Sequence, residues 1–123
     1  MTDLLNLFAR QLIPQEILNS FDVVSIDDSK EDELIISLVE KETLIPESDY
    51  DLVSNGYLKE VELSHFPANG RQCFLRLKRK RWKIKGNPGS QSFYNSYSYT
   101  FERTKATKEF GAFLKEISSK TSF

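Results

Sequence analysis

Apolar residues recur at helical spacing at the start of the chain. A first helical face would consist of Leu4, Leu5, Phe8 and Leu12. Pro14 cannot stand inside that helix, but it suits the first turn of a second helix. The apolar stripe of this second helix would be Ile17, Leu18 and Phe21. The spacing therefore predicts a helical pair over residues 1–21, with the break near Ile13.

The apolar period then becomes alternating, which is typical of strands. Residues 23–26 and 34–39 flank an acidic turn and predict a β-hairpin. One face of its second strand carries Leu34, Ile36 and Leu38. The other face carries Ile35 and Val39, which we expect the N-terminal helices to cover. Residues 40–56 are acidic and hold Pro46 and Asn55-Gly56, so they predict a loop with at most one helical turn.

A second hairpin is predicted around the sequence Ala68-Asn69-Gly70. Apolar residues must face apolar residues across it, because a one-residue slip turns every side chain over. This requirement is met when Leu63 lies opposite Leu75 and Val61 lies opposite Leu77. The loop then has three residues, and its last position favours the left-handed conformation that Gly70 adopts easily. The same register sets Glu62 opposite Arg76 and Glu60 opposite Lys78.

A third strand is expected after the turn signal Gly86-Asn87-Pro88-Gly89. Residues 93–101 alternate aromatic and polar positions, and pairing Tyr99 with Leu77 and Phe101 with Leu75 keeps the apolar face continuous. This register predicts a three-stranded antiparallel meander. Its polar face would set Tyr94 across from Trp82, beside Ser96, Ser98 and Thr100.

The chain ends in a predicted amphipathic helix over residues 104–119. Thr104 or Thr107 can cap it, and Glu109 lies in the first turn, where acids are favoured. The side chains expected to pack on the aromatic face of the meander are Phe110, Phe113, Leu114 and Ile117. We therefore expect one α+β domain over residues 1–123: a helical pair (1–21), an antiparallel sheet (22–101) and a C-terminal helix packed on that sheet (104–119).

Composition narrows the function classes. With 123 residues and 39% hydrophobic residues, the chain can form one modest core. No apolar run is long enough to span a membrane, and no leader pattern is present, so we expect a cytoplasmic protein. One histidine and one cysteine cannot form a metal site. We expect His65 in a turn or at the surface and Cys73 as a buried hydrophobe, and a Cys–His nucleophile pair lacks an orienting acid. No catalytic residue, cofactor or metal is predicted.

The formal net charge of −1 conceals two opposed halves. Residues 1–66 hold 15 acidic and 4 basic side chains, a net charge of −11, and residues 67–123 hold 13 basic and 3 acidic ones, a net charge of +10. The acids at 27–33 lack the spacing of a calcium loop and indicate a solvated turn. Seven of the ten residues 76–85 are basic, which favours binding to nucleic-acid phosphates.

The predicted interface follows from this basic strand. Arg76, Lys78, Lys80 and Trp82 would share a face with Tyr94, which offers cations and aromatic rings to a nucleic acid. Of the basic residues, Arg76 and Lys78 have predicted carboxylate partners, whereas Lys80, Arg81, Lys83 and Lys85 have none. The candidate nucleic-acid-binding residues are Arg76, Lys78, Lys80, Arg81, Trp82, Lys83, Lys85 and Tyr94.

Four segments of the chain also match, in order and spacing, a known pattern. They read LIPQEILNSFD (12–22), HFPANGR (65–71), LRLKRKRW (75–82) and TKEFGAFLKEI (107–117). Together they resemble the N-terminal-region proteins of bacterial insertion-sequence transposases that are split over two reading frames. The resemblance implies a DNA-binding or accessory fragment that acts on the transposon end with a separately encoded catalytic subunit of the DDE (RNase H-like) type. Related single-chain transposases continue into a zinc ribbon, but residues 83–90 hold no cysteine, so zinc is not implied.

Three hypotheses follow. In the first, the chain is a non-catalytic DNA-binding fragment that uses the basic and aromatic strand face, and the pattern leaves RNA open as the ligand. In the second, it is a protein-interaction module whose acidic half docks a basic partner such as the catalytic subunit. An inactive remnant is the third alternative. Neither a membrane nor a small-molecule substrate is expected.

Overall fold

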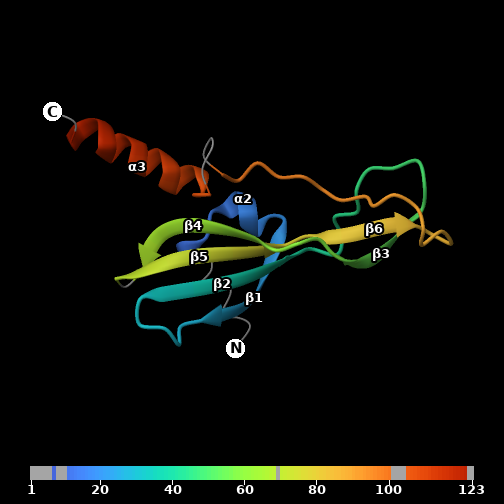
Figure 1. The fold of residues 1–123 in the computed structure, drawn as a ribbon, viewed down its shortest axis with the longest axis horizontal. Coiled ribbons are helices and arrows are strands. Elements are labelled where there is room, and N and C mark those ends of the chain that lie inside the picture. The colour runs from blue at the N-terminus through green and yellow to red at the C-terminus, as the bar shows by residue number, and fades with distance from the viewer. Residues whose placement is uncertain (1–6, 8–10, 69, 101–104, 122–123) are drawn as a thin grey trace.

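The computed structural model describes residues 7, 11–68, 70–100 and 105–121, with side chains as far as residue 117. Two sheets follow one another along the long axis of the molecule (Figure 1). The larger has the order β1-β2-β5-β4 and consists of β1 (Phe21–Asp27), β2 (Glu33–Glu40), β4 (Val61–Ala68) and β5 (Arg71–Lys78). The smaller is a two-stranded ribbon of β3 (Leu52–Tyr57) and β6 (Lys80–Ile84). The helices are α2 (Gln15–Leu18) and α3 (Lys108–Thr121). The α+β class is therefore confirmed.

The first predicted hairpin is confirmed as β1 and β2, which pair antiparallel. Leu34, Ile36 and Leu38 share the buried face of β2, as expected from their alternation. The turn between the strands is exposed, and Asp27 accepts hydrogen bonds from the backbone N–H of Ser29 at 3.0 Å and from its hydroxyl at 2.6 Å. These bonds lower the pKa of the Asp27 carboxyl.

The second hairpin has the predicted register. Leu63 lies opposite Leu75, Val61 opposite Leu77, and Glu62 opposite Arg76. Gly70 has a φ of +74°, as the turn requires. The loop is shorter than predicted, because Ala68 belongs to β4 and pairs with Arg71. Asn69, the other loop residue, lies outside the described residues.

The predicted meander is wrong. The edge of β5 that faces away from β4 pairs with β2 in parallel. Ile36 therefore lies opposite Leu75, and Leu38 lies opposite Leu77. Residues 93–100 form isolated bridges, not a strand, and Phe101 lies outside the described residues. The apolar alternation of β2 matches that of β5 as well as the aromatic residues of 93–101 do, and β2 is the segment that pairs with β5.

The predicted loop over residues 40–56 is confirmed only for residues 41–51, because Glu40 is the last residue of β2. The chain then forms β3, in which Leu52 lies opposite Ile84 and Val53 opposite Lys83. A bulge interrupts β3 before Tyr57, and it contains Gly56 with a φ of +74°. The Asn-Gly turn signal therefore marks a bulge inside a strand.

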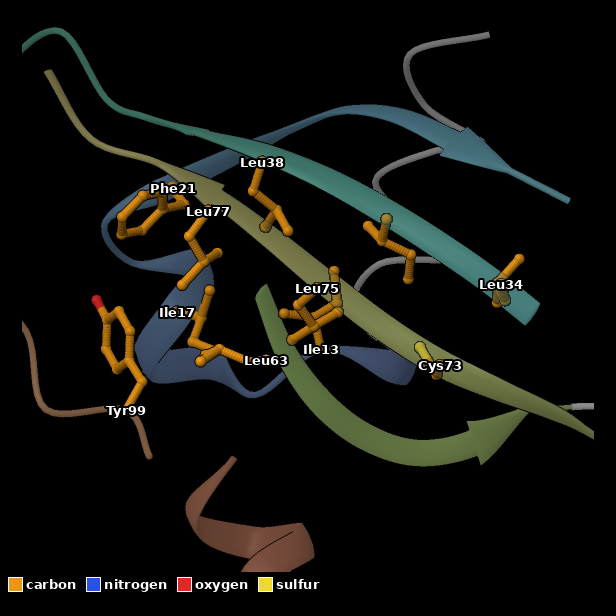
Figure 2. Close-up of a cluster of buried hydrophobic side chains, with 11 residues drawn as sticks. Ile13, Ile17, Phe21, Leu34, Leu38, Leu63, Cys73, Leu75, Leu77 and Tyr99 are labelled. Carbon is orange, nitrogen blue, oxygen red and sulfur yellow. The ribbon is translucent and has the colours of Figure 1, made fainter. Parts of the chain in front are cut away.

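One hydrophobic core joins the N-terminal segment to the large sheet (Figure 2). Ile13, Ile17 and Phe21 pack against the β2 face that carries Leu34, Ile36 and Leu38. The expectation that the N-terminal segment covers the opposite face is therefore wrong for these described residues, although Ile35 on that face is only 5% exposed. Strands β4 and β5 and the segment after β6 add Leu63, Cys73, Leu75, Leu77 and Tyr99. Full burial stabilises such side chains by about 1.5–3 kcal/mol each.

The N-terminal helical pair is described only in part. Of the second predicted helix, the structure shows only the four-residue α2, which Pro14 precedes as its N-cap residue, and the chain bends at Ile13 as predicted. The prediction that this helix reaches Phe21 is wrong, because α2 ends at Leu18 and Phe21 is the first residue of β1. Most of the first predicted helix, with Leu4, Leu5 and Phe8, lies outside the described residues.

The C-terminal helix is capped as predicted but does not pack as predicted. The hydroxyl of Thr107 accepts a hydrogen bond from the backbone N–H of Phe110 at 3.4 Å, and Glu109 lies in the first turn. Thr104 lies outside the described residues. Phe113, Leu114 and Ile117 are 43%, 46% and 42% exposed, because α3 extends away from the sheet (Figure 1). The rings of Phe110 and Phe113 each lie 5.2 Å from that of Phe66 on β4. No helix in the described ranges is long and apolar enough to cross a membrane.

Candidate nucleic-acid interface

The basic segment of residues 76–85 is divided between the two sheets. β5 ends at Lys78 and β6 begins at Lys80. In β5 the buried positions are odd-numbered, but in β6 they are even-numbered, and Lys80 and Trp82 are only 8% and 6% exposed. The prediction that Lys80 and Trp82 lie on an exposed face is therefore wrong, because the alternation of buried positions changes phase at Arg79, between β5 and β6.

A one-residue shift of register decides which cations lie beside Tyr94. Trp82 forms its bridge with Phe93, not with Tyr94. Such a shift moves every following side chain to the other face. Accordingly, the Arg79 guanidinium carbon lies 5.4 Å from the centroid of the Tyr94 ring. The cations on the side of Tyr94 are thus at the odd-numbered positions, whereas the predicted register places them on the opposite face.

Three of these cations are held by neutral oxygen atoms. Arg79 Nη1 donates to the Asn95 carbonyl at 2.9 Å, Arg81 Nε donates to the Asn55 carbonyl at 2.8 Å, and Lys83 Nζ donates to the Ser90 carbonyl at 2.5 Å. Such bonds orient the side chains and leave their charges available to an anion. Lys85 follows β6 and is exposed. We call the set Arg79, Arg81, Lys83, Lys85 and Tyr94 the basic ribbon face.

Gly56 leaves room for one of these cations. A Cβ atom on Gly56 would lie 3.3 Å from Arg81 Nη2, closer than most Cβ contacts. The same guanidinium nitrogen donates to the Asn55 side-chain oxygen at 3.3 Å. The bulge in β3 therefore positions Arg81 by close approach of the backbone as well as by hydrogen bonds.

The remaining basic residues of the segment have other partners. Arg76 Nε lies 3.0 Å from Glu62, as predicted, and 3.9 Å from Glu60, which was expected opposite Lys78. The hydrogen bond to Glu62 raises the pKa of Arg76. Lys78 Nζ instead lies 5.1 Å from the centroid of the Tyr57 ring. Lys80, for which no carboxylate partner was predicted, lies 3.4 Å from Glu42.

The basic ribbon face has no carboxylate partner in the part of the chain that the structure describes. No carboxylate there lies within 4.0 Å of a nitrogen of Arg79, Arg81, Lys83 or Lys85. The acidic turn of residues 28–32 lies at the opposite end of the long axis from the ribbon (Figure 1). The acidic turn therefore does not mask these cations, although the acidic half of the sequence also supplies β3, which pairs with β6.

A buried carboxylate fixes the junction between the two sheets. Glu40 is 2% exposed and accepts hydrogen bonds from the backbone N–H of Lys80 at 3.0 Å, from Asn95 Nδ2 at 3.2 Å and from the Tyr97 hydroxyl. Burial, followed by this hydrogen bond, raises the pKa of Tyr97. The sequence predicts a loop at Glu40, which is wrong because Glu40 belongs to β2. Glu40 lies two residues after the buried Leu38, so continued strand alternation would have placed its side chain on the core face.

The histidine and the cysteine are both buried. His65 was expected at the surface but lies in β4, 5% exposed, because its Nε2 faces the Leu12 carbonyl at 2.6 Å and its Nδ1 faces the Thr107 hydroxyl at 2.8 Å. Burial lowers the pKa of His65. Cys73 is 2% exposed, as predicted, and burial raises its pKa to about 11. With both ring nitrogens engaged, His65 is not placed to activate Cys73. The described residues hold no group of three or more potential metal ligands.

Comparison with protein-family models, with curated proteins and with solved structures finds no match to this chain. The candidate interface therefore rests on its own geometry and charge.

Proposed function

We propose that this chain is a non-catalytic DNA-binding protein that contacts the phosphate backbone through the basic ribbon face. The observation that carries the proposal is the set of four cations without a carboxylate partner in the described structure. Arg81 and Lys83 lie in β6, Arg79 directly precedes it and Lys85 directly follows it. Arg79, Arg81 and Lys83 are held by carbonyl oxygens. Cations held in this way lose less conformational entropy on binding phosphates.

The geometry also suits a linear polyanion. Alternate residues of a strand lie about 6.7 Å apart on one face. Arg79, Arg81 and Lys83 thus form a row with a spacing comparable to that of successive phosphates along a DNA strand. Tyr94 is 49% exposed beside this row and offers a ring for stacking on a base.

The resemblance to transposase N-terminal fragments supports the same proposal from the sequence. It supplies the expected DNA, the end of an insertion sequence, and the expected partner, a separately encoded catalytic subunit. The exposed acidic turn, with Asp28, Glu31 and Asp32, favours a second function in which this opposite end of the molecule docks that basic partner. Copurification of the two proteins, lost on charge reversal of these three residues, would establish it.

A mobility-shift titration with DNA at two salt concentrations tests DNA binding. Four phosphate contacts predict that affinity falls by about 50- to 150-fold between roughly 50 and 200 mM salt. Replacing Arg81, Lys83 and Lys85 by glutamine should abolish most of the binding at the lower salt. The matched control replaces Lys30, Lys41 and Lys59 by glutamine, which changes the net charge equally outside the basic ribbon face. No shift at the lower salt, or equal loss in both triple variants, would contradict the proposal.

A further inference from the structure

A cavity of about 300 Å³ adjoins the basic ribbon face. Arg79 belongs to both: its guanidinium lies over Tyr94 and also lines the cavity. The cavity wall contains Leu63 and Leu77 of the large sheet, and the segment after β6 closes it with Ser96, Tyr97 and Tyr99. A volume near 300 Å³ is at the lower end of the range for small-molecule sites.

The wall of this cavity suits a flat, partly polar ring. The rings of Tyr97 and Tyr99 stack at a centroid distance of 5.1 Å and an angle of 14°. Their hydroxyls donate elsewhere, to Glu40 and to the Glu16 carbonyl, so the ring surfaces line the cavity. Tyr97 is half-buried and offers more of its ring than Tyr99, which is 9% exposed. Only Nη1 of Arg79 has a hydrogen-bond acceptor among the described residues, and the remaining N–H groups of the guanidinium can donate to a ring oxygen or nitrogen.

We propose that this cavity receives an unpaired base of the DNA strand that the basic ribbon face binds, so that the ligand is single-stranded DNA. The inference rests on the proposed function, because Arg79, Arg81 and Lys83 must hold the phosphates on either side of that base. A base in a duplex is paired and stacked and enters such a cavity only after extrusion. Single-stranded DNA presents its bases without that cost.

Electrostatics alone predicts the opposite preference. Duplex DNA releases more counterions per neutralised phosphate than a single strand does, with salt slopes of about −0.9 and −0.7 per contact. A purely basic surface should therefore bind the duplex more tightly at low salt. A preference for single strands would show that a base contributes.

Fluorescence anisotropy with one oligonucleotide, single-stranded and as its duplex, tests the inference at a single salt concentration. Stacking of one base on aromatic rings predicts that the single strand binds roughly tenfold more tightly than the duplex. Val61→Phe and Ser96→Leu enlarge side chains on two sides of the cavity. Each should remove this preference and leave duplex affinity within about twofold of the wild type.

Val24→Phe is the matched control, because Val24 is 55% exposed on β1 and does not line the cavity. It should retain the single-strand preference. The two cavity variants lie on different elements, so that misfolding of one, detected by circular dichroism, leaves the other as the test. Duplex bound as tightly as single strands, or a folded cavity variant that retains the preference, would overturn the inference alone. Absence of binding to both DNA forms would instead overturn the proposed function.

Discussion

Replacing Glu40 by alanine should destabilise the protein by about 2–4 kcal/mol. The change removes the acceptor for the backbone N–H of Lys80 and for the Tyr97 hydroxyl. A donor left buried without a partner costs about 1–3 kcal/mol, and the partly buried Tyr97 hydroxyl contributes about 1 kcal/mol, at the low end of that range. Asn95 retains its hydrogen bond to the Leu44 carbonyl at 2.6 Å, so its contribution to the loss is small. The total is a large fraction of the roughly 6–18 kcal/mol expected for a domain of this size.

Urea unfolding followed by tryptophan fluorescence measures this loss. Trp82 is the only tryptophan, and it lies in β6, two residues from the Lys80 N–H that Glu40 binds. The matched control is Glu62→Ala, because Glu62 pairs with Arg76 on the surface, where an ion pair contributes only about 0–1 kcal/mol. A decrease in melting temperature on the order of 10 °C should accompany the Glu40 change. If Glu40→Ala costs no more than Glu62→Ala, the carboxylate does not hold the two sheets together.

Three further predictions concern buried or strained positions. Burial lowers the folded-state pKa of His65, so its contribution to the free energy of unfolding should be complete above about pH 6.5 and should decrease as pH falls below that value. In urea titrations, a His65→Gln variant should lack this decrease. Gly56→Ala should weaken DNA binding in anisotropy titrations because the new Cβ displaces Arg81. Gly70→Ala, with the same φ of +74° but open space around it, should lose similar stability, about 1–2 kcal/mol, without that effect; equal loss of binding in both would refute the role of Gly56. Because the pKa of Cys73 is raised to about 11, stability should decrease as pH rises from about 9 towards 11, and Cys73→Ala should remove this component; an unchanged pH profile would contradict it.

The two hairpins of the large sheet were predictable because local signals agree there. Leu63 and Leu75 pair as expected, since turn chemistry at Gly70 and the alternation of both strands require the same register. The cap of α3 was predictable for a similar reason, because Thr107 and Glu109 are local features of a helix start.

The edge of β5 was not predictable, because two segments satisfied the same pattern. Residues 34–38 and residues 97–101 both offer apolar side chains to Leu75 and Leu77, and the choice between them depends on packing between distant parts of the chain. The cavity depends on the same choice. Because residues 96–100 do not pair with β5, they can line a space beside it.

The charge of the candidate site was predictable from the sequence, but the identity of its exposed residues was not. The excess of positive charge at residues 79–85 was visible in the sequence, but the face it occupies was not. A bridge between Trp82 and Phe93 differs by one residue from the expected pairing, and that difference exchanges Lys80 and Trp82 for Arg79 and Arg81 beside Tyr94. Burial of Trp82 also removes it as a stacking residue for DNA, which leaves Tyr94 and the cavity for that role.

The salt dependence of DNA affinity tests the central claim most directly. We expect a plot of log K against log salt concentration to have a slope of about −3 to −4 for the wild type, which corresponds to contacts from the four cations of the basic ribbon face. Replacing Arg81, Lys83 and Lys85 by glutamine should bring the slope to about −1, whereas the variant at Lys30, Lys41 and Lys59 should keep the wild-type slope. Equal slopes in all three proteins would contradict the account, because the bound phosphates would then lie elsewhere on the molecule.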